Sequence, residues 1–193
     1  MPNAPSIDLK TTALLVMDYQ TAIVDMAADG KDELLKNMTA VIAAARRAKM
    51  KIVYVVVGFR PGYPEISPDN MSFSALKTGG LFAQGSPGTE IHSAVAPTAQ
   101  DVIVTKHRVG AFLGTDMEMV LRANKIETLL LAGIATSGVV LSTLRHAADA
   151  DFCIVVIADC CSDRDAEVHR VLTQKVFPRQ AVVTTADAIL AAL

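Results

Sequence analysis

Short apolar runs rich in valine, isoleucine and leucine recur along the whole chain, and they constrain its fold more than any other feature. They lie at residues 12–17, 52–57, 102–105, 128–132, 154–158 and 182–184. Runs of this length and composition are typical of buried strands. Residues 154–157 contain only isoleucine and valine, which is expected where helices cover both faces of a sheet.

Helical patterns separate most of these runs. They cover residues 31–48, 116–124, 138–150, 166–175 and 186–193. A chain that alternates strands and helices in this way forms a parallel sheet with helices on both faces. The sequence therefore predicts an α/β fold with three α/β/α layers and a six-stranded, mostly parallel, doubly wound sheet of the Rossmann-like type. There is no internal repeat and no linker, so residues 1–193 are expected to form one domain.

One segment, residues 58–97, breaks this alternation. It holds most of the prolines and many of the glycines of the chain. A loop-like stretch of this length inside a compact domain usually has a function. We expect it to form a lid or a contact between subunits.

Charge and cysteine content limit the partners and the compartment. The formal net charge is −2 at pH 7, whereas nucleic acids and anionic membranes both favour a clustered basic face. We therefore expect a small-molecule substrate, with no nucleic acid and no membrane as partner. Three cysteines do not suggest the disulfide framework of a secreted protein. No apolar run reaches the roughly 20 residues of a membrane span, and a cytoplasmic location is expected.

Polar or small residues follow three of the predicted strands, and open parallel sheets bind ligands beyond the carboxyl ends of their strands. Asp18 follows the first strand and could act as a general acid or base. Lys106 follows the third strand, where its ammonium group could pair with Asp18 and stabilise negative charge on a substrate. The turn at residues 133–138 leads from the fourth strand into a helix whose free amide groups could hold a carboxylate or an oxyanion. Taken singly, each feature also has an ordinary explanation: a helix cap, a surface lysine and a glycine turn.

Together, these segments resemble the isochorismatase-like family of cysteine hydrolases. The motifs that carry the resemblance are Asp18 with Gln20, Lys106 followed by Gly110-Ala111-Phe112, and Gly133-Ile134-Ala135-Thr136 before a helix. Supporting segments are GTEI at 88–91, AAD at 147–149, and DCCS at 159–162 with His169 beyond. The resemblance thus covers nearly the whole chain, and it implies a hydrolase that forms a homo-oligomer.

The resemblance also assigns the catalytic positions. It implies Asp18 as the acid or base and Lys106 as its electrostatic partner. The family's nucleophilic cysteine lies three residues past the threonine of the turn, and this chain has Val139 there. A valine side chain cannot attack a substrate, so the thiol that would form an acyl-enzyme is absent.

Other side chains are weak replacements for that thiol. Cys153 begins a predicted strand at the far edge of the sheet, where we expect it to be buried and inert. Cys160 and Cys161 follow a strand at the correct edge, but the family does not use these positions for chemistry. Ser137 and Ser142 lie near Val139, yet a serine nucleophile needs a base, and Asp18 is a poor one unless burial raises its pKa.

The remaining candidate residues would bind the substrate. They are Gln20, Arg60, Ala135, Thr136, Ser137, Gly138 and Ser142. The planar guanidinium group of Arg60 suits a substrate carboxylate. Members of the family with zinc carry an aspartate and two histidines after the second strand, but residues 57–64 contain no histidine, so neither a metal nor another cofactor is expected.

Three functions remain open. The first is hydrolysis of a small carboxylate-bearing metabolite without a covalent thioester, as in the members of the family that cleave a vinyl ether and also lack the cysteine. The second is a catalytically inactive descendant that binds a small molecule or serves as an oligomer. The third is an amide hydrolase that uses serine or water.

Overall fold

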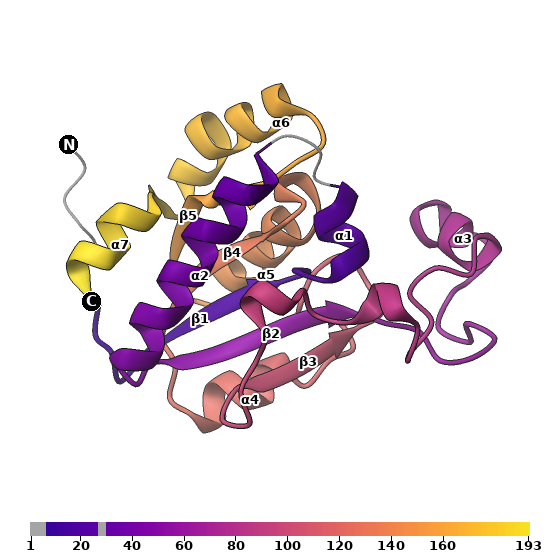
Figure 1. The fold of residues 1–193 in the computed structure, drawn as a ribbon, viewed down its shortest axis with the longest axis horizontal. Helices are drawn as coiled ribbons and strands as arrows, with labels where there is room; N and C mark the ends of the chain where they lie inside the picture. Colours follow the sequence, from indigo (N-terminus) through magenta and orange to yellow (C-terminus); the bar gives the residue numbers. More distant parts are fainter. Residues whose placement is uncertain (1–6, 27–29) are drawn as a thin grey trace.

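The computed structural model describes residues 7–26 and 30–193, and a six-stranded sheet runs through their centre (Figure 1). The strands are β1 (Thr12–Met17), β2 (Lys51–Val57), β3 (Val102–Lys106), β4 (Thr128–Ile134), β5 (Cys153–Ser162) and β6 (Val182–Thr184). Their order across the sheet is β3-β2-β1-β4-β5-β6. Every neighbouring pair is parallel. The predicted α/β class and the doubly wound parallel sheet are confirmed.

Helices cover both faces of this sheet. They are α1 (Thr21–Met26), α2 (Lys31–Arg47), α3 (Met71–Thr78), α4 (Met117–Ala123), α5 (Leu141–Asp149), α6 (Ala166–Val171) and α7 (Ala186–Ala192). Five shorter helical turns are η1 (Pro87–Thr89), η2 (Ser93–Val95), η3 (Thr136–Val140), η4 (Leu172–Val176) and η5 (Phe177–Arg179). Alternate residues of β1 enter two different apolar cores: Leu15 packs with residues of α4 and α5, and Leu14 packs with residues of α2 and α7. This alternation produces the three layers.

The strand order reverses between β1 and β4. From β1 the chain proceeds to β2 and β3 on one side, and from β4 to β5 and β6 on the other. The connections after β1 and β4 therefore diverge and leave a crevice at the carboxyl ends of these two strands, which is where ligands bind in sheets of this type. Asp18 and Ala135 are the first residues after β1 and β4.

Residues 58–97 are more ordered than their composition suggests. They contain α3, which begins where the side chain of Asn70 accepts a hydrogen bond from the Phe73 amide. They also supply most of a third apolar cluster, made of Val57, Phe59, Tyr63, Ile66, Phe73 and Phe82. In Figure 1, α3 projects from the body of the molecule.

Three further details differ from the sequence prediction. Strand β5 continues to Ser162, four residues past the predicted end at Ala158, because Cys161 and Ser162 pair with Gly133 and Ile134 after an irregularity in the β4–β5 register. Helix α1 was not predicted. Cys153 does begin a strand at the far edge, but it is exposed, so its predicted burial is wrong.

In the described part of the chain, no helix is both long and apolar enough to cross a membrane.

Candidate active site

Asp18 is buried at the carboxyl end of β1. Its backbone has a positive φ of 58°, a conformation that aspartate tolerates better than most residues. Its amide donates to the carbonyl of Val55 in β2, at 2.8 Å. One carboxylate oxygen, Oδ2, lies 3.0 Å from Lys106 Nζ, and the other, Oδ1, accepts no hydrogen bond from any described residue. The second oxygen is therefore a buried acceptor without a partner among the described residues.

Lys106 is the last residue of β3, and its side chain is as buried as that of Asp18. Its ammonium group also donates to the Arg108 carbonyl, at 3.1 Å. Burial raises the pKa of Asp18 and the nearby Lys106 opposes this, and the net result is a pKa above the ordinary 3.8. Burial of this kind favours the protonated form of the carboxyl group, which is the form that a general acid needs.

The turn after β4 is held rigidly by hydrogen bonds. It begins with a cis peptide bond between Ile134 and Ala135 and continues into η3. The Ser137 amide donates to Asp163 Oδ2, at 2.7 Å. The amides of Gly138 and Val140 donate to the Ala135 carbonyl. These amide groups already donate to acceptors within the protein. Fewer amides are therefore free to bind an anion than the sequence suggested.

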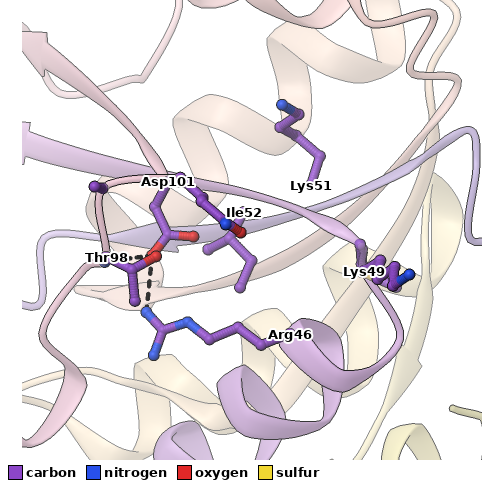
Figure 2. Close-up of a pocket in the computed structure, with 9 residues that line it drawn as sticks. Arg46, Lys49, Lys51, Ile52, Thr98 and Asp101 are labelled. Carbon is purple, nitrogen blue, oxygen red and sulfur yellow. Dashed lines mark hydrogen bonds and ion pairs between the residues drawn. The ribbon is translucent and has the colours of Figure 1, made fainter.

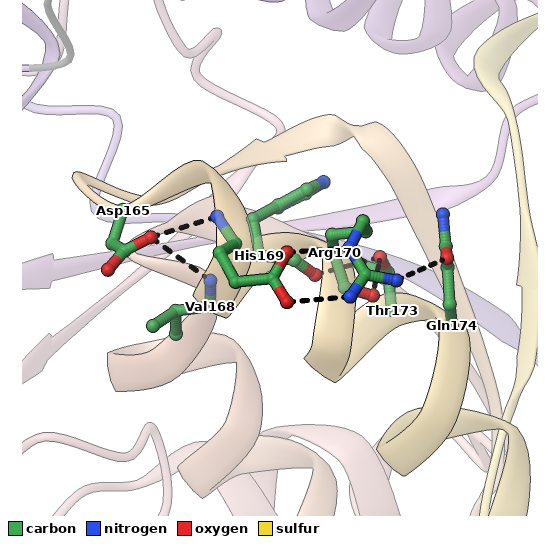
Figure 3. A network of polar contacts seen from close by, with 7 residues as sticks. Asp165, Val168, His169, Arg170, Thr173 and Gln174 are labelled. Carbon is green, nitrogen blue, oxygen red and sulfur yellow. Dashed lines mark hydrogen bonds and ion pairs between the residues drawn. The ribbon is translucent and has the colours of Figure 1, made fainter.

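Thr136 connects this turn to α6. Its side chain is fully buried, and its hydroxyl lies 2.8 Å from His169 Nδ1. Figure 3 shows how α6 holds this histidine: Asp165 caps the helix by accepting from the Val168 amide, and the Thr173 hydroxyl donates to the His169 carbonyl. The resemblance included His169, but the sequence did not show that its partner is Thr136.

Val139, at the position implied for the nucleophile, belongs to the apolar core. It is 2% exposed. A Cβ atom added to Gly133 would lie 3.2 Å from Val139 Cγ1 and 3.0 Å from Met17 Cβ. A side chain at Gly133 would therefore crowd both Met17 and Val139.

The cysteines near this edge are unsuited to nucleophilic attack. Cys160 and Cys161 are both buried. Burial raises the pKa of the Cys161 thiol to about 12 and that of Cys160 even higher. A thiol with such a pKa does not form the reactive thiolate.

Ser142 packs against Gly110. A Cβ atom added to this glycine would lie 3.2 Å from Ser142 Cβ.

Two candidate substrate-binding residues have other partners. The side-chain amide of Gln20 accepts from the Val57 amide and donates to the carbonyls of Val57 and Thr89, all within 2.9 Å. It therefore ties β1 to β2 and to the segment that follows. The guanidinium group of Arg60 forms an ion pair with Glu65. These contacts give Gln20 a framework role and leave it no free polar atom for a substrate, whereas Arg60 is paired with Glu65 but its side chain is 65% exposed.

An apolar cavity of about 300 Å³ lies beside the turn. It is lined by Ile23, Met26, Leu76, Leu81, Phe82, Ile134, Ala135, Ser162, Asp163 and Arg164. Met17 and Gly133 are register partners in β1 and β4, so Asp18, the first residue after β1, lies beside Ile134, the last residue of β4. The cavity therefore lies close to the strand end that carries Asp18, although Asp18 itself is not among its lining residues.

A second cavity, of about 760 Å³, lies at the opposite edge of the sheet, where β2 begins (Figure 2). Lys49, Lys51 and Ile52 are among the residues that line it. Arg46 forms an ion pair with Asp101 across it, at 2.8 Å. Because ligands of such sheets bind at the carboxyl ends of the strands, this cavity does not belong to the candidate active site.

Comparisons with known proteins agree with the fold and show the family. The isochorismatase domain model matches residues 12–188. The uncharacterised isochorismatase family protein YecD of Escherichia coli O157:H7 is 34% identical over 97% of this chain and 98% of its own length. The ureidoacrylate amidohydrolase RutB of Methylorubrum extorquens is 31% identical over 82% of this chain and 72% of its own. An isochorismatase family protein from Burkholderia thailandensis has the same fold, with a TM-score of 0.84 at 27% identity over 98% of both chains.

The parallel α/β fold and the match to the isochorismatase domain identify a hydrolase. More particularly, the chain belongs to the isochorismatase family.

Proposed function

We propose that this chain hydrolyses a small carboxylate-bearing metabolite without forming a covalent intermediate, with Asp18 as the general acid and base. The observation that carries the proposal is the buried Asp18 carboxyl group, with Oδ2 held by Lys106 and Oδ1 unbonded among the described residues. Burial of Val139 and the raised thiol pKa values of Cys160 and Cys161 favour a reaction that needs no thiolate.

Cleavage of a vinyl ether would use this arrangement as follows. Asp18 protonates the terminal carbon of the enol ether, and the carbon attached to oxygen becomes an oxocarbenium ion. Water adds to that carbon and returns a proton to the Asp18 carboxylate. The resulting hemiketal breaks its carbon–oxygen bond to release a ketone and an alcohol. Lys106 stabilises the ionised form of Asp18 between the two proton transfers.

Hydrolysis of isochorismate, together with a panel of ureido and carboxamide compounds, tests the proposal. We expect the wild-type protein to cleave the vinyl ether, and we expect Asp18→Asn to lower kcat/KM by about 10²–10⁴-fold, the usual contribution of general acid–base catalysis. Asp149→Asn is the matched control, because Asp149 is an exposed carboxylate at the end of α5.

Two other outcomes would replace the proposal. If the wild-type protein cleaves only amides, as the name of its relative RutB would suggest, the chain is an amide hydrolase that uses serine or water. If it cleaves nothing while Val139→Cys gains amidase activity, the chain is a catalytically inactive descendant that keeps the framework of the family.

A further inference from the structure

The cavity beside Ala135 is mainly apolar, whereas Asp18 and Lys106 form a charged pair. Seven of its lining residues are apolar: Ile23, Met26, Leu76, Leu81, Phe82, Ile134 and Ala135. They come from α1, α3 and the residues after it, β4 and the turn. Its volume of about 300 Å³ lies at the lower end of the range for small-molecule sites. A cavity of this size and lining favours a short aliphatic group.

Arg164 is the one cationic side chain among the described residues that line this cavity, and the one carboxylate among them, Asp163, accepts a hydrogen bond from the Ser137 amide. Arg164 lies just after β5, and its guanidinium group is 2.9 Å from the sulfur of Met26. Within residues 7–26 and 30–193, no carboxylate lies within ion-pair distance of Arg164, unlike Arg60 with its partner Glu65. A planar guanidinium group at the rim of an apolar cavity is suited to a carboxylate on the ligand.

We propose that this cavity is the specificity pocket of the enzyme and that it selects a substrate with a short aliphatic portion and a carboxylate, the aliphatic portion packing against Leu76 and Leu81 and the carboxylate pairing with Arg164. This inference rests on the proposed function, because it names the class of substrate presented to Asp18. It replaces Arg60 with Arg164 as the group that orients the carboxylate. The aliphatic selectivity is set by α3 and the residues that follow it.

Binding of simple probes tests the pocket without any turnover. The probes are the straight-chain monocarboxylates from acetate to octanoate and the matched primary alcohols, titrated into the protein and followed by ligand-observed NMR. Each methylene group buried in the pocket is worth about 0.8 kcal/mol, so affinity should rise about fourfold per carbon until the pocket is full. Carboxylates should bind more tightly than the alcohols of equal length.

Matched variants separate the two parts of the pocket. Leu81→Gln places an amide against the aliphatic chain and should flatten the increase with chain length. Leu113→Gln is its control, because Leu113 is 69% exposed and is not among the lining residues. Arg164→Gln should weaken all carboxylates by a similar factor and leave the alcohols unchanged. Arg60→Gln is its control and should change neither series.

The result is distinguishable from a failure of the proposed function. The proposal of an aliphatic pocket would be overturned if affinity did not rise with chain length, or if Leu81→Gln and Leu113→Gln showed the same dependence of affinity on chain length. This holds even if the protein hydrolyses isochorismate. Equal behaviour of Arg164→Gln and Arg60→Gln would overturn the carboxylate contact. If the protein shows the predicted binding pattern but hydrolyses nothing, the proposal about the pocket stands and the proposal of hydrolysis fails.

Discussion

Asp18 Oδ2 lies 3.0 Å from Lys106 Nζ although the strands that carry these residues are not neighbours. Strand β2 lies between β1 and β3, and backbone hydrogen bonds connect the end of β2 to the ends of both neighbours. The Asp18 amide donates to the Val55 carbonyl, and the Gly58 amide donates to the Lys106 carbonyl. The long lysine side chain crosses the end of β2 to reach the carboxylate. The geometry of the pair therefore depends on the parallel register of three strands.

Removing one charge of this pair should cost far more stability than removing both. Lys106→Met leaves the buried Asp18 without its cation, and we expect a loss of about 3–5 kcal/mol at neutral pH. The double variant Asp18→Asn, Lys106→Met buries no charge and should recover most of that loss. Urea unfolding of the two single variants and the double variant measures this coupling, and strictly additive effects would contradict it.

Acidification should lower the contribution of His169 to stability. Burial lowers the pKa of His169 below its ordinary 6.5, and the nearby Asp163 only partly opposes this. Below pH 6.5 the unfolded chain therefore binds a proton at this residue before the folded chain does, and the free energy of unfolding falls as the pH drops. His169→Gln keeps a hydrogen-bonding side chain near Thr136 but does not titrate. Urea unfolding between about pH 5 and 7 should show a smaller slope for this variant, and an unchanged slope would exclude His169 as the cause.

A methyl group at Gly133 should destabilise the fold. The added Cβ would lie 3.0 Å from Met17 Cβ and 3.1 Å from the Met17 carbonyl oxygen, and this backbone oxygen cannot move aside cheaply. We expect Gly133→Ala to cost about 1–3 kcal/mol, as other overpacked core substitutions do. Gly138→Ala is the control, because its nearest contacts would be at an ordinary 3.8 Å, and reduced chain entropy should make it neutral or slightly stabilising. Thermal and urea unfolding measure both.

Loss of Arg60 should affect stability and leave catalysis intact. The Glu65 side chain is only 7% exposed. Burial raises the pKa of Glu65, but hydrogen bonds from Arg60 and the backbone outweigh this, and the pKa lies below the ordinary 4.5. The ionised Glu65 therefore stabilises the fold above pH 4.5, and this contribution is lost as the pH falls through the folded pKa. Arg60→Gln should lower Tm at neutral pH, more than at pH 4, without changing kcat/KM. A large rise in KM would instead return Arg60 to the substrate site.

The sheet could be predicted from the sequence because buried parallel strands have a distinctive composition. Each predicted apolar run became a strand, and the longer helical patterns became helices. The end of β5 was missed because its last residues, Cys161 and Ser162, are held by pairing with β4 after a change of register, which no local pattern reveals. Helix α1 is six residues long, too short to show a helical period.

The Asp18–Lys106 pair could be predicted in part, because Asp18 follows β1, Lys106 ends β3, and these strand ends meet at one edge of the sheet. The apolar cavity could not, because its wall combines residues from distant parts of the chain, such as Ile23, Leu81 and Arg164. The prediction that Arg60 binds a substrate carboxylate rested on its residue type alone. Its partner Glu65 is only five residues away in the sequence, and this proximity could have suggested the local ion pair.

The lobe formed by residues 58–97 has an apolar cluster separate from the two cores that hold the sheet together. It nevertheless supplies Leu76, Leu81 and Phe82 to the wall of the cavity. If this cavity binds the substrate, as we propose, substitutions at these three residues change ligand preference at positions outside the strands that align Asp18 with Lys106. On this proposal, the group that reacts and the groups that choose the substrate lie in different parts of the chain, so one can change while the other stays the same.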